Sequence, residues 1–388
     1  MIEVSNKKIL GFADVHLGIK THSTQQSSGL FDAEIEARIA LNEILKRFSE
    51  DDIEIAICAG DMFHTSHPTT QNNEFITSWI EQMDLVGKPF LIIPGNHCVS
   101  THSHSLEFIS EMKKLENIFI YDALSYRNMP KFKFYDWNIV VVPYIQNYNN
   151  RDKDKLTFSA IKESINNIHD KTIFVSHIQE SSCTVGSEST MISKYVETID
   201  FNSISQKNII ALTGHIHKHQ IYEKRNGTVV VYPGSLFYLD KTDANQKKGY
   251  VLINKDGKIN FEEIKGIRRF VYYQIPPLVQ PIEYLKKIRF LRNQVVFLSV
   301  SLDEKIDSNI IREFLKIKGC LLGSIENVFS KERKFNIAEI SLEKKNKFSV
   351  FKDTVQMLLK ENKIDYVEDV LSEGILLLEE VLKDVDTK

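Results

Sequence analysis

Residues 7–217 repeat one local pattern five times, in which a short apolar run ends directly at a cluster of polar residues. The runs are KKILGFADVH, IEIAICAGDMFH, KPFLIIPGNH, KTIFVSH and NIIALTGHIH. Runs rich in Ile, Val, Leu and Phe are typical of strands that are buried on both faces of a sheet. The stretch FDAEIEARIALNEILKRF, between the first two runs, has helical periodicity and predicts a crossover helix. The pattern therefore predicts an α/β fold.

The residues that end these runs are carboxylates, an amide and imidazoles. They are Asp14, His16, Asp61, His64, Asn96, His97, His177, His215 and His217. All twelve histidines of the chain lie between His16 and His219. Ligands of α/β sheets bind beyond the carboxyl ends of the strands, so clusters that are far apart in sequence can converge in one crevice.

Carboxylate, amide and imidazole groups without thiolates suit divalent ions such as Mn²⁺, Fe²⁺, Zn²⁺ or Mg²⁺. So many candidate ligands allow two ions that share one carboxylate, about 3.5–4 Å apart, as in phosphoryl chemistry. Each motif alone has an ordinary structural explanation, such as a helix N-cap or turn for Asp14 and a solvated surface position for His97. The ordered set of five favours the metal interpretation.

Net charge, cysteine spacing and the length of the apolar runs limit the partners and the cellular compartment that the chain can have. The formal net charge is −3, so any polyanionic partner must be held by local charge. The four cysteines form no C-x-x-C pair, which fits a reducing cytoplasm. No apolar run approaches the roughly 20 residues of a membrane span. We therefore expect a cytoplasmic protein with no membrane contact.

The motifs D-x-H, G-D-x-x-H, G-N-H, a strand-end His and G-H-x-H, in this order, resemble the calcineurin-like metallophosphoesterase superfamily. DVHLG, GDMFHTSHPTT, PGNHCVSTH and VVYPGSLFYLD most resemble SbcD-type DNA repair and recombination nuclease subunits, which are equivalent to meiotic recombination eleven and have phage-encoded relatives. The resemblance implies a two-sheet α/β sandwich with a small α+β capping domain and C-terminal helices. It divides the chain into a nuclease domain (1–270), a DNA-binding capping domain (271–340) and a partner-binding helical segment (341–388).

The resemblance also implies a role for each site residue. One metal ion would be held by Asp14, His16, Asp61 and His217. The other would be held by Asp61, Asn96, His177 and His215, so that Asp61 bridges the two ions. His97 would assist the departing oxygen, and His64 would help to position the substrate. The family usually has an acidic residue after G-N-H, where this chain has Cys98. A small residue that fits a tight loop is the simplest explanation, and a thiol that attracts a soft metal or oxidises is the alternative.

The implied function is a two-metal DNA nuclease with Mn²⁺ as the expected cofactor and Mg²⁺, Fe²⁺ or Zn²⁺ as alternatives. The family activities are 3′ to 5′ exonuclease action on duplex DNA and endonuclease cutting of single strands or hairpins, in repair, recombination or replication. The implied partners are DNA, an SbcC-type coiled-coil ATPase and a second copy of the chain within a heterotetramer. If the chain is phage-encoded, the cytoplasm is that of the host. Two alternatives remain: a metallophosphatase or cyclic-nucleotide phosphodiesterase for small molecules, and a non-catalytic scaffold.

The C-terminal part of the chain has a different character. The stretch GYVLINKDGKINFEEI predicts a β-hairpin that finishes the second sheet of the fold. After it, QVVFLSVSL, SNIIREFLKIKG and CLLGSIENVFS suggest a small β-α-β unit. A basic cluster runs from Lys265 through Arg268 and Arg269 to four candidate DNA-binding residues. These are Lys286, Lys287, Arg289 and Arg292. An ordinary solvated face is the alternative explanation for the cluster.

Two amphipathic stretches, FSVFKDTVQMLLKEN and DYVEDVLSEGILLLEEVL, end the chain. Their apolar stripes must pack on each other, on the body of the protein or on a partner helix. The resemblance favours the base of the coiled coil of an SbcC-type ATPase. The candidate contacts are Phe351, Val355, Leu358, Leu371, Ile375 and Leu378.

Overall fold

The structure is a computed structural model of the 388-residue chain. It describes residues 7–327 except for 101–102, 111, 113–114, 146–154, 167–170, 187–197, 204–207, 278 and 302–305. The α-helices are α1 (Asp32–Phe48), α2 (Thr70–Leu85), α3 (Glu107–Ser110), α4 (Lys155–Asn166), α5 (Pro281–Leu285) and α6 (Ser308–Ile317). Two short 3₁₀ helices are η2 (Phe201–Ser203) and η3 (Lys241–Asp243).

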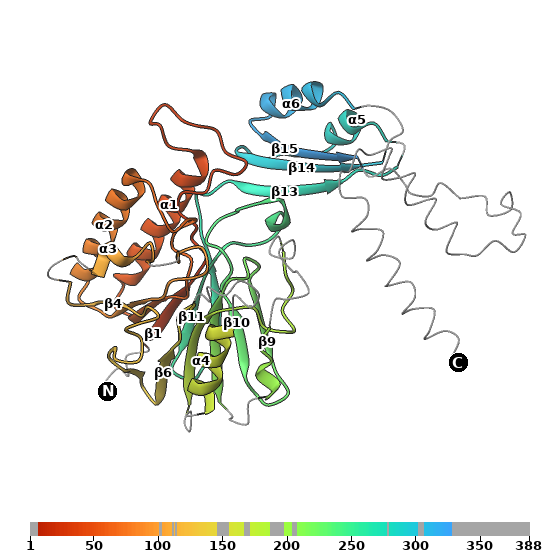
Figure 1. Ribbon diagram of the computed structural model, residues 1–388. Coiled ribbons are helices and arrows are strands. Elements are labelled where there is room, and N and C mark those ends of the chain that lie inside the picture. Colours follow the sequence, from red (N-terminus) through yellow and green to blue (C-terminus); the bar gives the residue numbers. More distant parts are fainter. Residues whose placement is uncertain are drawn as a thin grey trace, which may run out of the picture. The chain divides into compact units, whose positions relative to one another are not determined.

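Two six-stranded mixed sheets form the larger part of the described chain (Figure 1). The first has the order β12 (Ile259–Glu263), β11 (Gly249–Asn254), β1 (Lys8–Phe12), β2 (Ile53–Cys58), β3 (Phe90–Ile92) and β4 (Ile118–Ile120). The second has the order β5 (Phe132–Phe134), β6 (Trp137–Val141), β7 (Thr172–His177), β8 (Ile209–Gly214), β10 (Val229–Tyr232) and β9 (Gln220–Glu223). The predicted α/β fold with two sheets is confirmed.

The predicted crossover helix is α1, which connects the parallel strands β1 and β2. The predicted hairpin is also present, as the antiparallel pair β11 and β12. Its predicted place in the second sheet is wrong, because β11 pairs antiparallel with β1 in the first sheet. A hairpin sequence specifies its own turn and register, but the edge on which it docks depends on long-range packing.

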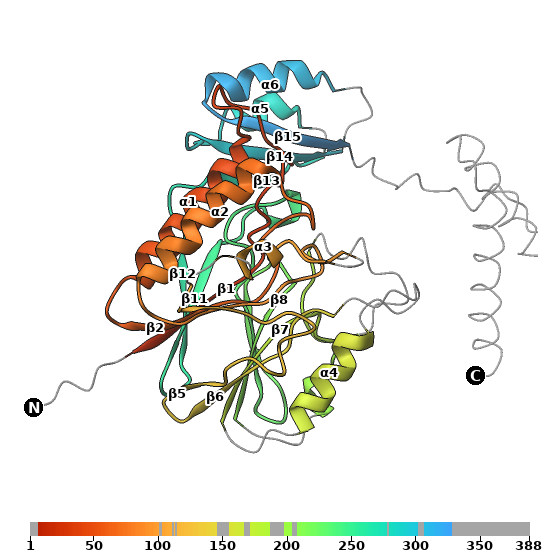
Figure 2. The same cartoon turned by 60° about the vertical axis from the view of Figure 1, so that its left-hand side comes forward.

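Alternating side chains along the strands build the buried clusters that lie between the layers of the fold. In β1, Leu10 and Phe12 belong to a buried cluster that includes residues of α1 and α2, such as Leu41 and Trp79. The intervening Ile9 belongs to a second cluster, which contains residues of both sheets, such as Val175. This is the period of two that a strand with two buried faces requires. Figure 2 shows α1 and α2 side by side along the first sheet.

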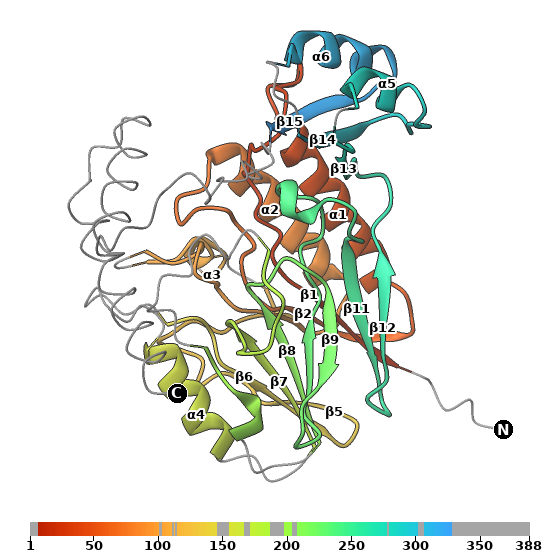
Figure 3. The same ribbon diagram turned by 90° about the vertical axis from the view of Figure 1, so that its right-hand side faces the viewer.

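The second sheet has its own helix layer, formed by α4 (Figure 3). Phe158, Ile161 and Ile165 of α4 share a buried cluster with Phe174 of β7 and with residues of β8 and β10. The order of layers is therefore helices, first sheet, second sheet and helix, which is the sandwich implied by the resemblance.

A third sheet has the order β13 (Arg269–Gln274), β14 (Gln294–Val300) and β15 (Leu321–Asn327), with all strands parallel. The predicted β-α-β unit is present as β14, α6 and β15. Leu285 of α5 and Leu315 of α6 pack with Val296 and Leu298 of β14. The division of the chain at residues 270 and 340 stays a prediction, and residues 341–388 lie outside the described residues.

None of the helices in the described part of the chain combines the length and the apolar character that crossing a membrane requires.

Candidate metal centre

The five polar clusters all lie at or just after the ends of strands, and these ends meet in one region. β1, β2 and β3 are adjacent parallel strands of the first sheet, and β7 and β8 are adjacent parallel strands of the second. Their carboxyl ends therefore lie together within each sheet, and contacts between the side chains join the two sets. The seven candidate metal ligands that the structure brings together are Asp14, His16, Asp61, Asn96, His177, His215 and His217.

One group of ligand atoms belongs to Asp14, His16 and His217. These atoms all lie within 4.8 Å of one another, which is close enough for all three to hold one ion. The Nε2 atoms of His16 and His217 are 3.1 Å apart. These two residues lie 201 positions apart in the sequence, so only the fold brings their rings together.

A second group surrounds the side chain of Asn96. Its Oδ1 atom lies 2.9 Å from Nε2 of His177 and 3.0 Å from Nδ1 of His215. Asp61 lies between the two groups, with its Oδ2 atom 3.3 Å from Nε2 of His177 and 3.7 Å from Nε2 of His16. This is the position that a bridging carboxylate requires. Asp14 also lies near the second group, with its Oδ1 atom 3.9 Å from Nδ1 of His177, so the division of the ligands between two ions stays a prediction.

The backbone is unusual at four of these residues. Asp14, His16, Asp61 and His215 have φ angles of 53°, 45°, 49° and 89°. Residues other than glycine rarely adopt this left-handed region. Each such residue costs about 1–3 kcal/mol and persists only where the surrounding structure holds it. Strain of this kind concentrates at functional sites, so its presence at four candidate ligands supports a functional role for the cluster.

Two glycines leave room for the ligand side chains. A Cβ atom at Gly60, which has a φ of 107°, would lie 2.1 Å from Nδ1 of His177. A Cβ atom at Gly95 would lie 2.3 Å from Oδ1 of Asp61. Any larger residue at either position would displace a candidate ligand. The close approach of backbone to ligands, together with the mixed Asp, Asn and His donor set, fits a pair of divalent ions.

Hydrogen bonds orient the second group. The backbone carbonyl of Ala59 accepts a hydrogen bond from Nδ1 of His177, at 2.9 Å. This bond orients the ring and points Nε2 of His177 at Asp61 and Asn96. The backbone N–H of His97 donates to Oδ1 of Asp61 at 3.0 Å, and the backbone N–H of His215 donates to Oδ1 of Asp14 at 3.0 Å. Sequence analysis missed the role of Ala59, because a backbone carbonyl leaves no signal in the sequence.

Burial and mutual repulsion keep most of these imidazoles neutral. Burial lowers the pKa of His16 well below its ordinary value, and it lowers the pKa of His215 to about 3 and of His217 to about 4. A neutral imidazole has the lone pair that a metal ion needs. His177 differs, because the charges of Asp61 and Asp14 outweigh its burial and raise its pKa to about 9. The pKa of Asp61 is lowered by His177 and His16 against the opposing effect of burial.

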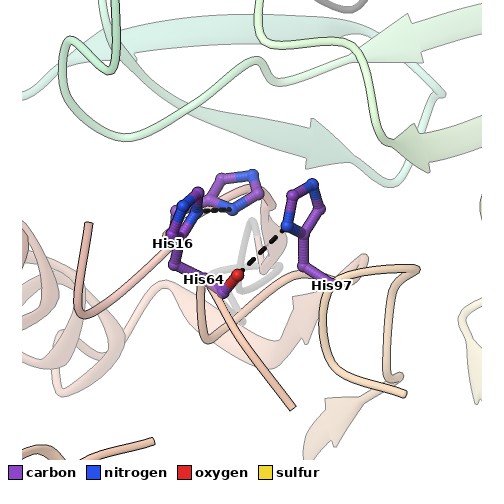
Figure 4. A group of neighbouring side chains, drawn as sticks. All are labelled: His16, His64 and His97. Carbon is purple, nitrogen blue, oxygen red and sulfur yellow. Dashed lines mark hydrogen bonds between the residues drawn. The ribbon is translucent and has the colours of Figure 1, made fainter. Parts of the chain in front are cut away.

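His64 and His97 stand beside the ligands, next to His16 (Figure 4). The carbonyl of His64 accepts a hydrogen bond from Nδ1 of His97, at 3.1 Å, so the other ring nitrogen of His97 is turned away from this contact. The rings of His64 and His97 are stacked with centroids 5.2 Å apart, and Nδ1 of His64 lies 3.4 Å from Nδ1 of His16. Both histidines are half-buried, whereas Asp14, His16 and His177 are deeply buried. His64 and His97 therefore form the more exposed edge of the cluster, which we call its rim.

Cys98 differs from the half-buried His97 in being fully buried. Its side chain is fully buried in the core between the first sheet and its helices, and its Sγ atom lies 3.8 Å from the carbonyl oxygen of Phe63. Burial raises the pKa of the Cys98 thiol to about 11, so the reactive thiolate is disfavoured at neutral pH. These contacts fit the interpretation of Cys98 as a small residue in a tight loop.

The four candidate DNA-binding residues lie between α5 and β14, in the third-sheet region and outside the histidine cluster. All four side chains are exposed, and Lys286 forms an ion pair with Glu283 at 2.7 Å. Arg268 does not belong to a basic surface, and its inclusion in the predicted cluster is wrong. Its guanidinium is largely buried against Glu36, at 2.7 Å, and Asp32, at 3.3 Å. The candidate partner contacts from Phe351 to Leu378 lie outside the described residues.

Comparison with known proteins identifies the family. The model of the calcineurin-like phosphoesterases matches residues 7–219, which is more than half of the chain and includes every candidate ligand. The chain belongs to this family. The family binds two divalent metal ions, and the described residues contain candidate groups to hold them. Membership thus supports a metal-dependent phosphoesterase.

Three curated relatives within reach of sequence comparison are nucleases or DNA repair proteins by name. The chain is 24% identical over 260 residues to the SbcD component of the nuclease SbcCD from Staphylococcus epidermidis and 24% identical over 277 residues to the same component from Staphylococcus saprophyticus. It is 27% identical over 275 residues to "DNA double-strand break repair protein Mre11" of Archaeoglobus fulgidus. The matches cover 64%, 68% and 67% of this chain. They span 66%, 70% and 58% of the relatives' own lengths.

Proposed function

We propose that this protein is a two-metal DNA nuclease of the SbcD type. The observation that carries the proposal is the convergence of five strand ends on one cluster of Asp, Asn and His side chains, with His64 and His97 at its open rim. The names of the three relatives support DNA as the substrate. The proposed activities are 3′ to 5′ exonuclease action on duplex DNA and endonuclease cutting of single strands or hairpins.

The residues of the chain would divide the work. Asp14, His16, Asp61 and His217 would hold one ion, and Asp61, Asn96, His177 and His215 would hold the other. Two bound divalent ions would lower the pKa of the attacking water and neutralise charge on the phosphoryl group, and Mn²⁺ is the ion that we expect. The hydrogen bond from His97 to the carbonyl of His64 fixes the His97 ring. In its doubly protonated form, the ring could then donate the proton on its other nitrogen to the departing oxygen.

His64 would have two roles in this arrangement. Its carbonyl orients His97, and its own ring, anchored beside His16, faces the same rim. A phosphodiester bound there would meet an imidazole on the side of the leaving group. A residue that orients a catalytic group to within a fraction of an ångström contributes to the rate without taking part in bond making.

We also propose partners that contact parts of the chain outside the metal centre. Lys286, Lys287, Arg289 and Arg292 would contact the DNA backbone from the third-sheet region, and such contacts make binding dependent on salt. An SbcC-type ATPase would bind the C-terminal segment, and two copies of each chain would form a heterotetramer in the cytoplasm. The same proposal assigns residues 1–270 to the nuclease domain and residues 271–340 to the capping domain.

A comparison of two substrates tests the substrate class. Purified full-length protein with Mn²⁺ is given end-labelled duplex DNA and, in parallel, bis-p-nitrophenyl phosphate. We expect metal-dependent cutting of the DNA. Turnover of the small ester without cutting of DNA would refute the nuclease and favour a small-molecule phosphoesterase. Inactivity on both substrates by protein that has bound two ions would favour a scaffold.

A further inference from the structure

We propose that Lys248 is a positioning residue that holds the metal ligand His217 in place through the backbone of that ligand. This inference rests on the proposed metal centre and adds to it a residue from a different part of the chain. Lys248 lies 31 positions after His217, just before β11, and its side chain is 1% exposed.

The ammonium group of Lys248 has three acceptors. It donates to the backbone carbonyl of His217 at 2.9 Å, to Oγ of Ser235 at 2.9 Å and to Oδ1 of Asp243 at 2.5 Å. An ammonium group has three protons, so these contacts satisfy it completely. Asp243 is also buried, and its other oxygen accepts a hydrogen bond from the backbone N–H of Leu239 at 2.8 Å.

His217 needs such support because it lies outside the strands, in the irregular segment between β8 and β9. No strand pairing therefore fixes its peptide group. Its carbonyl instead accepts two hydrogen bonds, from Nζ of Lys248 and from the backbone N–H of Ser235 at 3.0 Å. Ser235 is bridged in turn to Ala13, directly before the candidate ligand Asp14. These contacts set the place from which the His217 ring reaches His16.

The charge of Lys248 makes the burial of its side chain costly. Burying an ammonium and a carboxylate costs free energy that their attraction only partly returns, and an apolar pair of similar size is often no less stable. The contact between the ammonium group and the backbone carbonyl of His217 is what distinguishes this pair, because it holds a candidate ligand in place. Groups that orient metal ligands typically change metal affinity by about 10–100-fold when they are removed.

The chain contains a matched control. Lys224 is a second buried lysine, with a side chain that is 4% exposed, and it pairs with the fully buried Glu180 at 2.6 Å. Its ammonium group also donates to Oγ of Ser182 at 2.6 Å. Neither acceptor is a candidate metal ligand. Removing this pair therefore repeats the loss of a buried lysine and carboxylate without touching His217.

The test uses double variants of the full chain, so that no buried charge is left without its partner. The variant Lys248→Met/Asp243→Asn is compared with Lys224→Met/Glu180→Gln and with the wild type. Mn²⁺ binding is measured by calorimetry, and the spin coupling of the bound pair is measured by electron paramagnetic resonance. Thermal unfolding of the metal-free proteins shows how much stability each variant has lost.

We expect the wild type and the Lys224 variant to bind two coupled ions with similar affinities. The Lys248 variant should bind one ion about 10–100-fold more weakly and lose the coupled signal, with the second ion nearly unaffected. Wild-type affinity for both ions in the Lys248 variant would overturn the inference, and so would an equal loss of affinity in the two variants. A wild type that fails to bind two ions would instead refute the proposed metal centre.

Discussion

The paired side chains of His177 and Asp61 make the stability of the metal-free protein depend on pH. The pKa of His177 is raised from 6.5 to about 9 in the folded chain, chiefly by Asp61, which outweighs the opposing effect of burial. Because the folded pKa lies above the unfolded value, the protonated imidazole stabilises the fold. This contribution is fully present below pH 6.5 and is lost as the pH rises through about 9. The difference in pKa corresponds to about 3 kcal/mol of unfolding free energy.

The assay is urea unfolding of the chelator-treated protein between pH 6 and pH 9.5, followed by the fluorescence of the buried Trp79 and Trp137. His177→Asn is the control, because it removes the titrating group while leaving a polar side chain of similar reach. The wild type should lose about 3 kcal/mol relative to this variant across the range. Parallel curves for the two proteins would refute the assignment of a raised pKa to His177.

Metal binding should show the opposite dependence on pH. A bound ion takes the lone pair of the imidazole and displaces its proton. The apparent affinity for Mn²⁺ should therefore rise by up to about tenfold per pH unit between pH 6.5 and pH 8, because this range lies below the pKa of His177. His16, His215 and His217 should contribute no further proton release, since burial lowers their pKa values.

Three further predictions concern the proposed assignments. Asp61→Ala should abolish DNA cutting and the spin coupling of bound Mn²⁺, because it removes the ligand between the two ions; cutting within tenfold of the wild type would contradict the bridging role. Arg289→Gln should weaken DNA binding and reduce the slope of log affinity against log salt concentration by about 1. Arg268→Gln should leave this slope unchanged. It should instead lower the free energy of unfolding by about 3 kcal/mol, because it leaves Glu36 unpaired. Equal effects of the two arginines on the slope would refute this division. Truncation after residue 340 should retain Mn²⁺ binding but lose the ATPase partner, and co-purification of the truncated chain with that partner would contradict the assignment of residues 341–388 as the partner-binding segment.

The sequence was most informative where chemistry and pattern coincide. Each of the five apolar runs contains a strand, and each polar cluster lies at or just after the end of that strand, because a strand with two buried faces ends where polar residues begin. Burial on both faces also predicted the layered α/β fold. The crossover helix α1 could be predicted because its apolar stripe has the period of a helix.

Other features depend on contacts that no local pattern records. The hairpin of β11 and β12 pairs with β1, at a sheet edge created by residues more than 200 positions away. Arg268 looks like its basic neighbours in the sequence, and only the fold places Glu36 against it. Lys248 likewise stands in the polar run NQKK and carries no mark of burial. The carbonyl of Ala59 and the left-handed backbone of Asp61 are properties of the chain path and leave no signal in residue type.

The central claim is that the converging strand ends build a two-metal centre in which His97 assists the cleavage of DNA. The most direct test measures bound Mn²⁺ and single-turnover cutting of end-labelled duplex and hairpin DNA in the same samples of wild type and His97→Asn, with and without an SbcC-type ATPase. We predict two ions in both proteins, cutting by the wild type, and a loss of cutting in His97→Asn of at least about 100-fold. Equal cutting by the two proteins, or no cutting by folded wild type loaded with two ions in the presence of the ATPase, would contradict the account.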